Sequence, residues 1–123
     1  MTSLEIHREE RNDGLVYFEL EGCLDAHSFE KLDALFERHF DQGSYRFVVD
    51  VRRLGYLSSA GAGVFIGAAG TCQDNNGNVV LIQPPHEVTE ILELLGVYRI
   101  FPVVDGIDQA RKHFEQEERE AVV

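Results

Sequence analysis

Basic residues are scarce in this sequence, as are cysteines and long apolar runs. Eleven lysines and arginines stand against 22 aspartates and glutamates over 123 residues, which gives a formal charge of −11 at pH 7. Such an acidic chain is repelled by nucleic-acid phosphates and by anionic lipid headgroups. We therefore expect neither nucleic acid nor a membrane as a partner.

The rarity of cysteine argues against metal and redox functions. Cys23 and Cys72 lie far apart and form no Cys-x-x-Cys pair. No two of the five histidines are four residues apart, so the common zinc motifs are missing and we predict no metal site. No run of 18 apolar residues and no leader-like segment is found. We therefore expect neither a transmembrane helix nor a signal peptide, and predict a cytoplasmic protein.

Length and hydrophobic periodicity predict one domain of alternating strands and helices. We expect a single domain over residues 1–123, with its core at about 4–116 and a charged C-terminal tail. Asp13-Gly14 predicts an initial hairpin, and Asp25 is placed to cap the first helix. The order ββαβαβαβα predicts an α/β fold with a mixed sheet and about four packed helices. The predicted strands cover residues 4–9, 15–20, 47–51, 79–82 and 100–103, and the predicted helices about 25–43, 60–72, 86–96 and 107–118.

A glycine-rich stretch follows the strand predicted at residues 47–51. We expect residues 52–59 to form a loop and residues 60–72 a helix that packs closely on the sheet. Its glycines, Gly63 and Gly67 among them, are expected on the buried face, where a larger side chain would overpack. The start of a helix after a buried strand is where ligands and partners meet an open α/β sheet.

Three nucleotide-binding or catalytic motifs place glycines at the start of a helix after a strand, and this sequence matches none of them. A dinucleotide fingerprint needs glycine where Ile66 stands. A Walker loop needs a lysine after its glycines, and no basic residue lies between Arg53 and Arg99. A nucleophile elbow around Ser59 needs glycine where Leu57 stands. We therefore predict no catalytic residue and no cofactor.

Residues 50–64 read DVRRLGYLSSAGAGV, and residues 22–25 read GCLD. Both segments resemble STAS domains, the family that includes bacterial anti-sigma-factor antagonists. In that family a strand ends in an acidic residue, a loop closes with an aromatic or apolar pair, and a serine followed by a small residue and glycine opens a helix. The second segment is similar to the family's Gly-x-Leu-Asp, and the order of elements agrees over nearly the whole chain.

The resemblance implies a phosphorylated serine. In the antagonists this serine is phosphorylated by an anti-sigma factor that is a serine kinase, and the position-by-position match gives Ser59. The best-known members have aspartate before it and serine or threonine after it, where this chain has Ser58 and Ala60. Ser58 is therefore a competing acceptor.

The same resemblance implies a surface for the kinase. Asp25 matches an aspartate found beside the phosphorylation site. It also follows a strand that should end on the same sheet edge as the strand before Ser59, so we expect the two residues to be neighbours. The implied partner-binding residues are Asp25, Ser58, Ser59, Ala60, Gly61 and Gly63.

Three functions follow from these observations. The first is an anti-sigma-factor antagonist that binds a kinase-type anti-sigma factor, is switched off by phosphorylation of Ser59, and so regulates transcription indirectly. The second is a non-phosphorylated STAS scaffold subunit of a transporter or signalling assembly, in which Ser58 and Ser59 only cap a helix. The third is an enzyme with Ser59 as nucleophile, for which the sequence offers no base.

Overall fold

The computed structural model describes residues 3–10 and 13–122 and places them in a five-stranded sheet with four α-helices. Neighbouring strands in the sheet follow one another in the chain. The first pair is antiparallel and the other pairs are parallel. The strands are β1 (Glu5–Glu10), β2 (Val16–Leu24), β3 (Arg46–Leu57), β4 (Asn78–Ile82) and β5 (Val103–Val104), and the helices are α1 (Phe29–Asp41), α2 (Ser59–Asp74), α3 (His86–Leu94) and α4 (Ile107–Val122).

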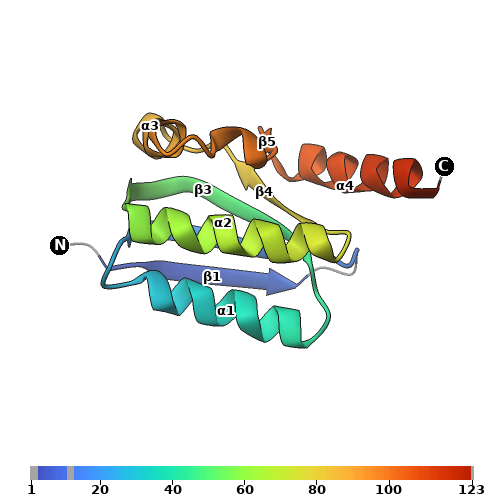
Figure 1. Ribbon diagram of the computed structural model, residues 1–123, viewed down its shortest axis with the longest axis horizontal. Helices are drawn as coiled ribbons and strands as arrows, with labels where there is room; N and C mark the ends of the chain where they lie inside the picture. Colours follow the sequence, from blue (N-terminus) through green and yellow to red (C-terminus); the bar gives the residue numbers. More distant parts are fainter. Residues whose placement is uncertain (1–2, 11–12, 123) are drawn as a thin grey trace.

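The predicted α/β fold, its mixed sheet and its ββαβαβαβα order are confirmed. One face of the sheet is covered by α1, α2 and α3, and α4 lies on the other face over β3, β4 and β5 (Figure 1). No helix in the described part of the chain is both long and apolar enough to cross a bilayer.

Two unequal cores hold these layers together. The larger lies under α1, α2 and α3, and it includes an aromatic group in which the rings of Phe18, Phe36 and Phe47 meet at 4.9 to 5.7 Å between centroids. The smaller lies under α4, where Phe114 packs against Val48 and Val80. The central strands β3 and β4 therefore bury side chains on both faces, as their β-branched runs predict.

The prediction of a loop at residues 52–59 is wrong. β3 continues to Leu57 and pairs with β2 along its whole length, so that only Ser58 separates the strand from α2. The extension carries two register shifts, at each of which β3 has one residue more than β2. Such bulges let the polar residues of this segment face solvent while Leu54 and Leu57 stay buried.

The last strand is shorter than predicted. Residues 98–100 form a 3₁₀ helix, η1 (Tyr98–Ile100), and β5 begins only at Val103. Proline has no N–H to donate to a ladder, so the residue before β5, Pro102, cannot extend the strand on its donor side.

The expected burial of Gly63 and Gly67 is wrong as well. Both are exposed on α2, and a Cβ atom built on either meets no atom within 4 Å. Gly61 instead makes the close approach, since a Cβ there would lie 2.6 Å from the Leu24 carbonyl oxygen and 2.9 Å from Leu57 Cδ1. The helix contacts the sheet through its first turn and through alanines further along, Ala62, Ala68 and Ala69.

These positions predict opposite effects of the same substitution. Gly67→Ala should raise the free energy of unfolding by about 0.5–1 kcal/mol, because alanine has the higher helix propensity and the added methyl group meets open space. Gly61→Ala should lower it by about 1–3 kcal/mol through overpacking. Urea unfolding of both variants checks this, and two changes of the same sign would contradict the placement of α2.

Candidate functional site

The candidate site lies where β2 and β3 end together and α2 begins. Leu24 and Leu57 are register partners, and the Ser58 N–H donates to the Leu24 carbonyl oxygen at 3.0 Å. The residues that follow these strand ends, Asp25 and Ser59, therefore lie on the same edge of the sheet, as predicted. In Figure 1 this edge is at the left, where α2 starts.

The two serines hold different positions in the helix. Ser58 has extended backbone angles and is the N-cap of α2, and its Oγ accepts a hydrogen bond from the Gly61 N–H at 3.2 Å. Ser59 is the first helical residue, and its side chain is exposed. Among the described residues nothing hydrogen-bonds to its hydroxyl. One serine is thus committed to the fold and the other faces solvent.

The capping role of Ser58 fits its position, where the best-known antagonists have aspartate. Serine and aspartate are equally good N-caps, since either offers an oxygen to the free N–H groups of the first turn. Ser58 keeps the cap but removes its negative charge. The first turn of α2 contains no acidic residue, so its N–H groups have no anionic side chain beside them in the helix.

Asp25 does not cap α1, contrary to the prediction. The helix begins at Phe29, and a turn intervenes in which the Asp25 carboxylate accepts hydrogen bonds from the His27 N–H at 2.9 Å and from the Ser28 hydroxyl at 3.2 Å. The single hydroxyl proton of Ser28 is shared between this carboxylate and the Cys23 carbonyl oxygen, which is the nearer acceptor at 2.8 Å. The carboxylate is therefore held in place, half-buried, at the strand end beside Ser58.

The remaining predicted residues divide between the surface and the interior. Ala60 is half-buried and Gly63 is exposed, whereas Gly61 is buried against β2 and β3. Tyr56, which the sequence indicated only as part of the aromatic or apolar pair that closes the predicted loop, adds an aromatic side chain that is 51% exposed two residues before the cap. Because residues 52–59 were predicted to form a loop, the sequence did not indicate that Tyr56 stands near the end of a strand.

A buried ion pair fixes the path of β3 toward the site. The Asp50 side chain is only 3% exposed, and it is held by Arg52, whose Nη2 donates to Oδ2 at 2.6 Å and whose backbone N–H donates to Oδ1 at 3.1 Å. The Tyr17 hydroxyl also donates to Oδ2, at 3.1 Å. These bonds span the first bulge of β3 and so set the register that leads to Ser58.

The charges of this cluster shift two pKa values. Burial alone would raise the pKa of Asp50, but the hydrogen bonds and charge of Arg52, helped by Tyr17, outweigh it and hold that pKa below its ordinary value. Burial and the Asp50 carboxylate raise the pKa of Tyr17 to about 12. Asp50 is therefore ionised and Tyr17 neutral near pH 7.

Comparison with known proteins identifies the family. The model of the STAS domain matches residues 8–110. The chain belongs to the STAS domain family. BtrV of Bordetella bronchiseptica, named as an anti-sigma factor antagonist, is 33% identical over 103 residues, which cover 84% of this chain and 89% of BtrV.

Solved STAS structures share the fold at lower identity. The unphosphorylated form of the anti-sigma factor antagonist SpoIIAA matches with a TM-score of 0.79 and 20% identity, over 91% of this chain and 97% of SpoIIAA. The phosphorylated form of SpoIIAA from Bacillus matches with a TM-score of 0.71 and 20% identity, over 89% of this chain and 98% of SpoIIAA. The murine anion transporter Slc26a9 matches with a TM-score of 0.73 and 10% identity, over 94% of this chain and 22% of the transporter.

Proposed function

We propose that this STAS domain is an anti-sigma-factor antagonist that binds a kinase-type anti-sigma factor and is switched off by phosphorylation of Ser59. The observation that carries the proposal is the pair of serines at the start of α2, of which Ser58 caps the helix and Ser59 is exposed. The named role of BtrV, a relative at 33% identity, supports the same class of function.

The geometry favours Ser59 over Ser58 as the phosphate acceptor. A kinase must reach the acceptor oxygen and receive its proton, and the Ser59 hydroxyl is exposed and makes no hydrogen bond to any residue that the structure describes. Ser58 Oγ is half-buried against the Gly61 N–H, so modifying it would break the cap. In the proposed reaction the γ-phosphoryl group passes from ATP to Ser59 Oγ, ADP leaves, and the hydroxyl proton passes to a base of the kinase.

The surroundings of Ser59 suit a partner that binds without the phosphate. Ala60 and Gly63 offer a surface with almost no side-chain volume on the first turns of α2, and the fixed Asp25 carboxylate stands at the neighbouring strand end. A partner can therefore approach the backbone of α2 closely. Aromatic side chains that are exposed on one side, such as Tyr56, are frequent anchors in protein interfaces.

A kinase assay tests the proposal. The wild type, Ser59→Ala and Ser58→Ala are incubated with ATP and each kinase-fold anti-sigma factor of the source genome, and the phosphate is located by mass spectrometry. We expect one phosphate on Ser59 of the wild type and none on Ser59→Ala. Ser58→Ala should still be phosphorylated, although it should lose about 1 kcal/mol of stability with its cap.

Two results would count against the proposal. Full phosphorylation of Ser59→Ala would move the site to another residue. Failure of every such kinase to modify the wild type would favour the scaffold function, in which both serines are structural.

A further inference from the structure

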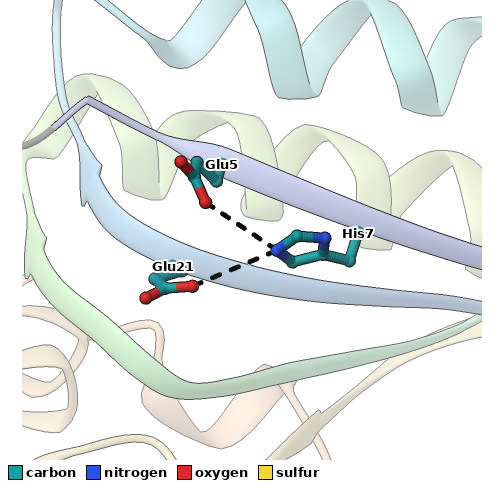
Figure 2. A group of neighbouring side chains, drawn as sticks. All are labelled: Glu5, His7 and Glu21. Carbon is teal, nitrogen blue, oxygen red and sulfur yellow. Dashed lines mark ion pairs between the residues drawn. The ribbon is translucent and has the colours of Figure 1, made fainter.

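Glu5 and His7 of β1 and Glu21 of β2 converge on the face of the sheet opposite α1 and α2. His7 Nε2 lies 3.9 Å from Glu5 Oε2 and 4.0 Å from Glu21 Oε2, and the two carboxylates point toward the same ring nitrogen (Figure 2). One oxygen or nitrogen from each of the three residues lies within 4.8 Å of the other two. The proposed antagonist function uses none of them.

The strand pairing holds these side chains together. Glu5 and Glu21 are register partners in the antiparallel ladder, and His7 stands two residues after Glu5 on the same face. The convergence therefore needs no loop to move. α4 makes its main contacts on this face with β3, β4 and β5, and the three side chains keep 44% to 65% of their surface exposed.

The arrangement calls for a cation. Two carboxylates directly opposite each other in a ladder destabilise it, and the ladder partner of His7 is a third glutamate, Glu19. The chain as a whole carries a formal charge of −11. A divalent cation between the side chains would remove the repulsion between the carboxylates, and the negative charge of the whole chain would attract it.

We propose that Glu5, His7 and Glu21 form a binding site for a divalent transition-metal ion, with Zn²⁺ as its best-suited occupant. Zinc binds imidazole nitrogen at about 2.0–2.1 Å and carboxylate oxygen at about 2.0–2.2 Å, which places neighbouring ligand atoms about 3.3 Å apart. The observed 3.9 and 4.0 Å need only small rotations of exposed side chains to reach that spacing. The imidazole favours zinc over Mg²⁺ and Ca²⁺, which prefer oxygen ligands.

Calorimetric titration of the untagged full chain with ZnCl₂ tests the site. The wild type should bind one Zn²⁺ at this site, and His7→Gln and Glu21→Gln should each weaken that binding at least tenfold. The matched control is His86→Gln, because His86 is also an exposed histidine but pairs with just one carboxylate in the described part of the chain, that of Glu90 at 3.6 Å. This variant should bind zinc as the wild type does.

A second measurement keeps the outcome clear. In EDTA, His7→Gln and His86→Gln should melt near the wild type, and Glu21→Gln at the same temperature or slightly above it, because it removes one of two opposed carboxylates. Saturating zinc should raise the melting temperature of the wild type and of His86→Gln only. About a hundredfold excess of Mg²⁺ should not displace the zinc. Unchanged zinc affinity and unchanged thermal shift in His7→Gln, or displacement of the zinc by Mg²⁺, would overturn the proposal.

Discussion

Phosphorylation of Ser59 should weaken binding to the anti-sigma factor several-hundred-fold and leave the melting temperature close to that of the unmodified protein. A phosphate adds a charge of about −1.5 to −2. An interface packed over Ala60 and Gly63 must either desolvate this charge or move away from it. A loss of roughly 3–4 kcal/mol corresponds to the expected weakening.

The fold should accept the same phosphate because of where Ser59 stands. It is the first residue of a 16-residue helix, its neighbour caps the helix with a neutral hydroxyl, and the first turn carries no acidic residue. A negative charge at a helix N-terminus is typically worth about 0.3–1 kcal/mol in favour of folding. Phosphorylation of Ser59 should therefore weaken partner binding without lowering the stability of the fold.

The comparison uses unmodified wild type, phosphorylated wild type, Ser59→Ala and Ser59→Asp, each titrated against the kinase that the phosphorylation assay identifies. Ser59→Ala should bind as the unmodified wild type does, because it removes only a solvent-facing hydroxyl. Ser59→Asp should bind weakly and melt near the wild type. Equal affinity of the phosphorylated and unmodified proteins would show that the proposed switch does not operate.

Arg52→Ala should lower the free energy of unfolding near pH 7 by clearly more than its matched control does, because it leaves the buried Asp50 carboxylate without its guanidinium. The loss should be smaller than for a fully buried pair, because the Arg52 side chain is itself 54% exposed and water screens its charge. The matched control is Arg53→Ala. Arg53 is the exposed next residue and has no ion pair among the described residues, so its loss should cost less than about 0.5 kcal/mol.

The loss in Arg52→Ala should depend on pH in a defined direction. The pKa of Asp50 in the folded wild type lies below its ordinary value, so the ion pair stabilises the fold above that ordinary value and is lost as pH falls through the folded pKa. Without Arg52 the burial of the carboxyl dominates and its pKa rises. The difference between wild type and variant should therefore narrow between pH 7 and about pH 4. Urea unfolding at both pH values measures it, and a constant difference would contradict the role given to the pair.

Much of the fold followed from local patterns in the sequence. The Asp13-Gly14 turn, the β-branched runs of the central strands and the spacing of apolar residues gave the order of elements correctly. Ser59 came from the resemblance of residues 50–64 to STAS domains, and the structure places it as the exposed first residue of α2. These features depend on residues close together in the chain.

The errors arose where contacts between distant segments decide the structure. Arg52, Arg53 and Gly55 look like loop residues, but pairing with β2 and two bulges keep them in a strand. The glycines of α2 gave no amphipathic pattern from which a buried face could be read. His39 is buried, with its ring 5.8 Å from that of Phe47 on β3, and its place in the sequence does not show this contact. The cluster of Glu5, His7 and Glu21 joins two strands and forms no spacing motif.

Finally, the simple order of strands leaves the sheet with only two edges, and both discourage another chain from adding a strand. β5 offers just two residues on its side. β1 is longer, but its sequence EIHREE places a charged or titratable side chain at every position except Ile6. Short edges and edges rich in charge are the two commonest ways in which β-proteins avoid edge-to-edge aggregation. Replacing Arg8 and Glu9 by valine would turn β1 into a template for such pairing without touching either core.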